Sequence, residues 1–223
     1  HELRTPLNAI IGFSDVMRQQ VFGPVAPARY ADYVERIHTA GNHLLSIIGD
    51  VLDVSRINAG KFDLYEETID LRDPIREAIE IAEGAARSKH IKILAPPARG
   101  ELGIMGDRRV IRQIVLNLLS NAVKFSPEAS SVKVNLSLDA DGVAISVIDL
   151  GIGISKDDLA RMAEPFFQAG DVLTRKQGGT GLGLHLVKGF AALHDGTVAI
   201  DSELGKGTTV TVRLPRARLR MAA

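Results

Sequence analysis

Two amides and one amine share a spacing that could bind a phosphate ligand together with its metal ion. Asn117, Asn121 and Lys124 are four and three residues apart, so a helix would carry them on one face. Amide oxygens suit a hard cation such as Mg²⁺, and an ammonium group attracts phosphate. A solvated helix face would show the same pattern and weighs equally when this segment is taken alone.

A carboxylate and two glycines follow a strand-like run. Asp149 ends an alternating apolar stretch, and Gly151 and Gly153 come directly after it. A carboxylate at a strand end can accept a hydrogen bond from an exocyclic amine, and the glycines would let a flat ring approach the backbone. Taken alone, the segment is more often an ordinary strand-to-helix turn.

A glycine-rich segment opens a helix-like stretch. Gly178-Gly179-Thr180-Gly181-Leu182-Gly183-Leu184 precedes a run that continues as a helix. Glycines at a helix start present free backbone amides to an anion. The spacing also resembles a dinucleotide fingerprint, but no β-α-β unit surrounds it, which makes that interpretation weak.

A pair of aromatic residues stands beside a polar, glycine-flanked stretch. Pro165-Phe166-Phe167-Gln168 precedes residues 169–178, which contain Arg175 and Lys176. An aromatic anchor next to such a loop predicts a hinged lid. The alternative is that both phenylalanines simply lie in the core.

The first residue is a candidate nucleophile. A neutral imidazole such as that of His1 has a lone pair that can attack a phosphoryl group, and Glu2 beside it could hold the ring proton. The chain begins without Met, in what the pattern indicates is the middle of a helix, so we expect it to be a fragment. The other histidines match no motif and are expected to be structural or solvent-facing: His38, His43, His90, His185 and His194.

Residues 1–60 have the pattern of two packed helices. Apolar residues recur every three or four positions, first from Leu3 to Met17 and then from Val34 to Ser55, with a break at Gly23-Pro24. Two helices cannot bury both stripes, so we expect a helical hairpin that dimerises into a four-helix bundle. Asn58-Ala59-Gly60 supplies a helix stop.

Residues 61–223 alternate between strands and helices, which predicts an α+β domain with helices on one face of a mostly antiparallel sheet. Asp141-Gly142 between two alternating runs indicates a hairpin. The expected strands are 63–70, 91–95, 131–139, 143–149, 197–201 and 208–214, and the expected helices are 71–88, 108–125, 156–162 and 182–193. Residues 215–223 are expected to form a frayed tail or the stump of a linker.

Composition narrows the class of protein. The 223 residues carry 27 basic and 27 acidic side chains, so no basic footprint for nucleic acid exists. The absence of Cys excludes disulfides and thiol catalysis and fits a reducing compartment. No apolar run reaches the roughly 18 residues needed to span a bilayer, and no signal peptide is present. We therefore expect a cytoplasmic domain that itself makes no contact with a membrane or with nucleic acid.

In this order, the segments around Asn117, Asp149, Phe167 and Gly181 resemble the N, G1, F and G2 boxes of sensor histidine kinases, and His1-Glu2-Leu3-Arg4-Thr5-Pro6-Leu7 resembles their H box. The resemblance implies a dimerisation and phosphoacceptor hairpin over 1–60. It implies a Bergerat-type ATP-binding α+β sandwich, shared with gyrase, Hsp90 and MutL, over 61–223. Phe22-Gly23-Pro24-Val25 with the long second helix resembles alphaproteobacterial kinases of the PleC and DivJ kind.

The resemblance implies roles for individual residues. His1 would take the γ-phosphoryl group of ATP and pass it to an aspartate on a response-regulator receiver domain. Glu2 would accept or hold the proton of the His1 ring, and Thr5 would orient a water that dephosphorylates the regulator. Such parent proteins can be anchored in the bacterial inner membrane.

The resemblance also assigns the ATP site. Asn121 together with Asn117 would hold Mg²⁺, Lys124 would meet the phosphates, and Asp149 would accept from the adenine amino group. The remaining positions expected to line the nucleotide are Phe125, Gly151, Gly153, Phe167, Gly179, Thr180, Gly181, Leu182, Gly183 and Thr208.

Two positions of this chain differ from those of proteins that the resemblance groups with it. At the position of Asn117, gyrase, Hsp90 and MutL have a Glu that activates water; an amide cannot take that proton, so ATP should be kept for His1. Many relatives have Arg after the paired aromatics, where this chain has Gln168. We expect Arg175 to supply that positive charge to the developing phosphoryl group.

Two other functions fit part of the pattern. A pseudokinase scaffold would keep the fold and dimerise without phosphate transfer, although the motif residues are all present. A gyrase-type ATPase would release phosphate, but Asn117 and the helical hairpin argue against it.

Overall fold

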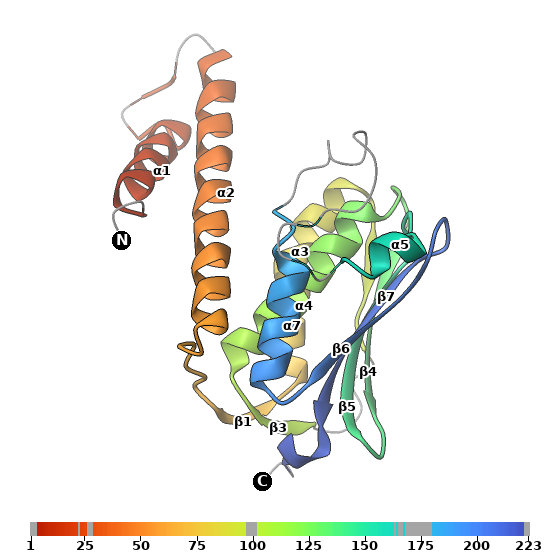
Figure 1. The fold of residues 1–223 in the computed structure, drawn as a ribbon. Coiled ribbons are helices and arrows are strands. Elements are labelled where there is room, and N and C mark those ends of the chain that lie inside the picture. The colour runs from red at the N-terminus through yellow and green to blue at the C-terminus, as the bar shows by residue number, and fades with distance from the viewer. Residues whose placement is uncertain are drawn as a thin grey trace. The chain divides into compact units, whose positions relative to one another are not determined.

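The computed structural model describes residues 4–21, 23–25, 29–96, 102–162, 164, 167 and 180–220 (Figure 1). It divides into two compact units, His1–Ser55 and Arg56–Ala223. The first unit is helical and the second combines helices with two sheets. Each unit has its own buried side chains, as expected for separate domains.

The first unit is a helical hairpin of α1 (Arg4–Arg18) and α2, which runs from Arg29 to Asn58. Leu7 and Val34 are buried. Gly41 on α2 lies against Ile11 on α1: a Cβ built on this glycine would lie 2.7 Å from Ile11 Cγ1. The absence of a side chain at residue 41 therefore sets how closely the two helices approach.

Much of the apolar surface of the hairpin stays exposed within one chain. Phe13 is 70% exposed and Met17 is 55% exposed, although both continue the apolar stripe of α1. The other large apolar side chains exposed on the hairpin include Ile10, Ile37, Leu44, Val51 and Leu52. Exposed large apolar side chains repeated along both helices indicate a site of association.

The end of α2 follows the predicted helix stop. Gly60 has φ +63°, a left-handed conformation that favours glycine. The Lys61 backbone N–H donates to Arg56 O (2.8 Å), and the Gly60 N–H donates to Ile57 O (3.0 Å). These bonds satisfy carbonyls at the helix end, so the prediction of a stop at residues 58–60 is confirmed.

The second unit is built on a five-stranded sheet in the order β2-β4-β5-β7-β6, in which only the β2–β4 pair is parallel. Its helices α3, α4 and α7 lie together on one side of this sheet (Figure 1). The strands are β2 (Lys92–Leu94), β4 (Ser131–Leu138), β5 (Gly142–Asp149), β6 (Thr197–Glu203) and β7 (Gly207–Pro215). The helices are α3 (Arg72–Ser88), α4 (Arg108–Phe125), a short α5 (Lys156–Leu159) and α7 (Gly183–Leu193). The α+β layer predicted from the sequence is confirmed.

The core lies between this sheet and the helices. Alternate residues of β5 and β7 point into it, as the period of two predicts, and meet the apolar stripes of α4 and α7. Its members include Ile111, Ile114, Leu118, Leu119, Val134, Ile145, Val147, Leu186, Phe190 and Val212, each at most 3% exposed. This packing fixes the ends of α4, α7 and β5, which carry the candidate site.

A second, three-stranded sheet was not predicted. It has the order β1-β3-β8, with β1 at Glu67–Asp70, β3 at Gly103–Gly106 and β8 at Leu219–Arg220. The expected strand 63–70 is therefore correct only in its last four residues. The expected helix 156–162 ends at Leu159, so it has a single turn, and the Ser155 side chain caps its start by accepting from Asp158 N.

The prediction of a frayed tail or a linker stump from residue 215 is wrong as far as residue 220, because these residues end β7 and form a 3₁₀ turn and β8. Residues 221–223 lie outside the described residues. Arg218 holds this segment, because its guanidinium donates to Glu66 (2.5 Å), Asp195 (2.9 Å) and the Met105 carbonyl (3.2 Å). An arginine-rich terminal segment is typical of a solvated tail, but here the Arg218 side chain bonds residues that are far away in the sequence.

Candidate functional site

The two amides predicted on α4 face the first residue of α7. A Cβ built on Gly183 would lie 3.9 Å from Asn117 Cγ and 3.9 Å from Asn121 Nδ2. The structure therefore brings the paired amides and the glycine-rich segment together. Any larger side chain at residue 183 would occupy the space in front of both amides.

The amide of Asn117 is incompletely bonded. Its Nδ2 is buried and has no hydrogen-bond partner among the described residues, while its Oδ1 accepts a long bond (3.5 Å) from Gln113 Nε2. A buried polar atom without a partner costs free energy, so such atoms concentrate where a ligand will satisfy them. The Asn117 side chain thus indicates a ligand site beside Gly183.

The last turn of α4 carries an amine and an aromatic ring. The Lys124 Nζ lies 4.6 Å from the centre of the Phe125 ring, and both side chains are half-buried. Burial lowers the pKa of the Lys124 ammonium. An anionic ligand would offset this desolvation, which is what the interpretation of Lys124 as a phosphate contact requires.

Asp149 is held at the end of β5 by backbone amides. Its Oδ1 accepts from Gly151 N (2.8 Å) and from Thr208 N (3.3 Å), the residue paired with it on β7. Burial raises the pKa of the Asp149 carboxyl, and the two backbone bonds act in the opposite direction. Both of these bonds go to Oδ1, which leaves Oδ2 to accept from a ligand.

Gly151 and Gly153 make the turn after β5 possible. A Cβ on Gly151 would lie 2.7 Å from the Phe125 carbonyl oxygen, so this turn packs directly on the end of α4. Gly153 has φ +67°, and a Cβ there would overlap the Glu203 carbonyl. The turn therefore joins Asp149 to the last residue of α4.

Ser202 on β6 joins three segments, and its role was missed in the sequence. Its Oγ donates to Gly207 O (2.9 Å), accepts from Ile154 N (2.9 Å) and lies 2.9 Å from Thr208 Oγ1. Thr208, a predicted site residue, is thus fixed beside Asp149. A serine within a strand gives no local signal, since these bonds depend on strand register.

The described part of the glycine-rich segment runs from Thr180 into α7. Thr180 Oγ1 accepts from Leu182 N (3.2 Å), and Gly181 has φ +71°. The Leu182 side chain is fully buried in the core, so only its backbone can face a ligand. The helix start at Gly183 therefore has a fixed position.

Several predicted site residues lie outside the described residues: His1, Glu2, Arg175 and Gly179. Thr5 is an exposed residue of α1. Of the aromatic pair, only Phe167 is described; the Arg161 guanidinium lies 4.4 Å from its ring centre and is paired with Glu164 at 3.3 Å. Arg161 therefore places a positive charge beside Phe167, and no motif in the sequence pointed to it.

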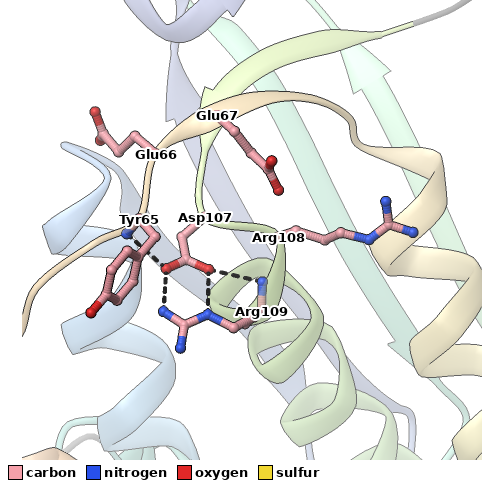
Figure 2. A pocket seen from close by; sticks show the side chains of 6 residues that line it. All are labelled: Tyr65, Glu66, Glu67, Asp107, Arg108 and Arg109. Carbon is pink, nitrogen blue, oxygen red and sulfur yellow. Dashed lines mark hydrogen bonds and ion pairs between the residues drawn. The ribbon is translucent and has the colours of Figure 1, made fainter.

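A pocket of about 360 Å³ lies at the other end of α4 (Figure 2). It is lined by Tyr65, Glu66, Glu67, Asp107, Arg108 and Arg109. Most of its charges already have protein partners: Arg109 bonds Asp107 at 2.8 Å, Arg108 pairs with Glu77, and Glu66 pairs with Arg218. Asp107 Oδ2 also accepts from Tyr65 N at 3.0 Å. Because α4 rises about 1.5 Å per residue, this pocket is roughly 25 Å from Lys124 and is not part of the candidate site.

Among the residues that the structure describes, no group of three or more His, Asp or Glu side chains could hold a metal. No helix in this part of the chain is both long enough and apolar enough to cross a membrane. The amides of Asn117 and Asn121 remain as oxygen donors, and they fit a metal that is also bound by a phosphate ligand and water.

A helical hairpin followed by an α+β sandwich, with paired amides facing a glycine-rich helix start, defines a Bergerat-type ATP-binding class. Family models give the same result. The model described as the histidine kinase-, DNA gyrase B- and HSP90-like ATPase matches residues 106–218. The His Kinase A phospho-acceptor domain model matches residues 1–60. The chain belongs to the histidine kinase family.

Named relatives support this assignment. The histidine protein kinase DivJ of Caulobacter vibrioides is 49% identical over 216 residues, which cover 96% of this chain and 36% of DivJ. The non-motile and phage-resistance protein of the same organism is 44% identical over 220 residues, covering 96% and 26%. The chain thus spans well under half the length of these relatives. The predicted resemblance to kinases of the DivJ kind is confirmed.

Solved structures agree with the fold. Full-length ShkA, determined in complex with AMPPNP, has a TM-score of 0.81 and 33% identity; the match covers all of this chain and 45% of that one. The Acinetobacter baumannii histidine kinase AdeS has a TM-score of 0.67 at 21% identity, which supports the fold alone.

Proposed function

We propose that this chain is the core of a two-component sensor kinase that transfers the γ-phosphoryl group of ATP to His1. The observation that carries the proposal is the amide of Asn117, which faces Gly183 at the start of α7 and whose buried Nδ2 has no hydrogen-bond partner among the described residues. An amide there can bind a ligand but cannot deprotonate water. ATP bound beside it is therefore kept for a nucleophile other than water.

The nucleotide would lie between the end of α4, the turn after β5 and the start of α7. Asp149 Oδ2 would accept from the adenine amino group, because Oδ1 is already bonded by Gly151 N and Thr208 N. Phe125 would flank the base, and Lys124 would contact the phosphates. Asn117 and Asn121 would supply oxygen to Mg²⁺, which neutralises phosphate charge when bound.

The hairpin would supply the acceptor. Residues 1–60 would dimerise through the exposed apolar face that includes Phe13 and Met17. Within the dimer, Glu2 would take the proton from the His1 ring as its nitrogen attacks. A response-regulator receiver domain would then take the phosphoryl group on an aspartate, with Thr5 orienting water for its later removal. We place this core in the cytoplasm.

One experiment tests the proposal. The wild-type chain and His1→Ala are incubated with γ-labelled ATP and Mg²⁺, and both bound label and free phosphate are measured. Acid-labile, base-stable label on the wild type only is the expected result. Free phosphate without label would instead identify an ATPase, and neither signal would identify a scaffold, so either result contradicts the kinase.

A further inference from the structure

Lys89 contacts the end of the helix that carries the candidate site. It follows α3 in the sequence, and its Nζ donates to the Lys124 carbonyl (2.7 Å), the Val123 carbonyl (3.0 Å) and the Ser126 carbonyl (3.3 Å). The residues that accept these bonds follow Lys89 by 34 to 37 positions in the sequence. A single ammonium group thus bonds three consecutive or nearly consecutive carbonyls at one helix end.

The end of α4 needs this contact because it lacks the usual glycine closure. The last four carbonyls of a helix have no partner within it, and a left-handed glycine commonly supplies the missing backbone N–H groups. Here Ser126 is extended (φ −74°, ψ 146°), its backbone N–H donates to Ala122 O, and the next residue is Pro127, which has no N–H. Lys89 takes the place of that closure and puts a positive charge at the negative end of the helix.

Backbone bonds hold Lys89 in place. Its own carbonyl accepts from Ala129 N (3.0 Å), and Lys92 N donates to Ser130 O (3.0 Å). The turn after α3 and the segment after α4 are therefore joined on both sides of the Lys89 side chain. This arrangement restricts the ammonium group to the end of α4.

The position of that last turn determines the position of two proposed nucleotide contacts. Lys124 and Phe125 are its final residues, and the Phe125 carbonyl packs against Gly151 in the turn that holds Asp149. We infer that Lys89 is a positioning residue for the nucleotide site, acting through Lys124 and Phe125. The inference rests on the proposed function, since it needs these residues to bind ATP.

The test compares Lys89→Met with Lys89→Arg and with Lys92→Met, a change at an exposed lysine of β2. Binding of AMPPNP with Mg²⁺ is measured by calorimetry, and autophosphorylation gives KM and kcat. We expect Lys89→Met to raise Kd and KM by about three- to tenfold with a smaller effect on kcat. Lys89→Arg should recover most of the affinity, because a guanidinium can donate to the same carbonyls, and Lys92→Met should match the wild type.

Two controls separate positioning from a loss of stability. Ile104→Val shortens a fully buried side chain of β3, and it should lower the Tm without raising Kd. Lys89→Gln keeps a hydrogen-bond donor without the charge, and its Kd for AMPPNP should lie between those of Lys89→Met and Lys89→Arg. Unchanged AMPPNP affinity in Lys89→Met, with normal binding by the wild type, would overturn the inference alone. A wild type that binds no AMPPNP would overturn the proposed function, and this inference with it.

Discussion

The backbone N–H of Asp107 donates a hydrogen bond of 3.1 Å to Nε2 of His194. Nδ1 of the same ring lies 2.9 Å from the Phe190 carbonyl, so Nδ1 carries the proton and Nε2 accepts. His194 is fully buried. Because Asp107 precedes α4 and His194 follows α7, this bond joins the two helices at the ends opposite the candidate site.

The bond requires a neutral ring, which makes the domain sensitive to acid. Burial lowers the pKa of His194. The folded state then binds fewer protons than the unfolded state, so the free energy of unfolding falls as pH drops below about 6.5 toward the folded pKa. Arg218 also lowers the pKa of the ring, whereas Phe190, Glu66 and Asp107 raise it.

We therefore expect His194→Gln to reduce this acid sensitivity. The amide of Gln can accept from Asp107 N and donate to the Phe190 carbonyl without titrating. Between pH 7.5 and pH 5.5, the wild type should lose up to about 1.4 kcal/mol more than the variant for each pH unit below 6.5. Urea unfolding at several pH values measures this difference. Parallel pH profiles would contradict the prediction.

Asp149→Asn should separate binding from stability. Because the folded pKa of Asp149 is raised, its carboxyl favours the folded state at low pH, and that contribution is lost as pH rises through the folded pKa. A neutral amide removes this cost at pH 7.5 and can still accept from Gly151 N. We expect unchanged or higher stability but an affinity for adenine nucleotide that is weaker by about 10- to 100-fold. Calorimetric binding and thermal unfolding of the same sample check both.

Gly183→Ala tests the space in front of the paired amides. The new Cβ would make ordinary contacts of 3.9 Å with Asn117 and Asn121, so the fold should tolerate it. It would also fill the space that the proposed ligand needs, and we expect affinity to fall at least about tenfold.

The matched control is Gly84→Ala on α3, where a Cβ meets nothing within 4 Å. It should raise stability by up to about 1 kcal/mol and leave nucleotide binding unchanged. Equal affinities for the two variants would show that the space beside Gly183 is not used by the ligand.

Arg175→Ala tests the charge that Gln168 does not provide. We expect autophosphorylation to slow by about 10- to 100-fold, because a cation offsets the charge that develops on the transferred group. Arg161→Ala is the comparison, since Arg161 contacts Phe167 and Glu164. If Arg161→Ala slows autophosphorylation and Arg175→Ala does not, Arg161 and not Arg175 supplies the positive charge.

The motif helices and the main sheet could be predicted because their signals are local. The period of apolar residues places α4 at Arg108–Phe125, the same bounds that the structure has. Asp141-Gly142 similarly predicts the β4–β5 hairpin, which pairs in register from Leu138 with Val143. In these elements each residue's preference depends on its near neighbours.

The three-stranded sheet and the contacts of Lys89 and Ser202 could not be predicted in this way. β8 has two residues and pairs with β3, and the neighbouring Arg218 bonds Glu66, which is 152 residues away in the chain. Lys89 looks like any surface lysine until α4 ends beside it. Such features depend on the tertiary arrangement, which a single sequence does not display through periodicity or spacing.

Gly41→Ala should destabilise the hairpin, because its Cβ would lie 2.7 Å from Ile11 Cγ1. Crowding of this kind costs about 1–3 kcal/mol, which exceeds the roughly 1 kcal/mol that Ala gains over Gly in a helix. Gly49→Ala on the same helix meets nothing within 4 Å and should stabilise it. Thermal unfolding followed by circular dichroism compares the two. Adding Ile11→Ala should remove most of the penalty of Gly41→Ala, since the overlapping atom is gone; additive effects of the two changes would mean that residues 11 and 41 are not in contact.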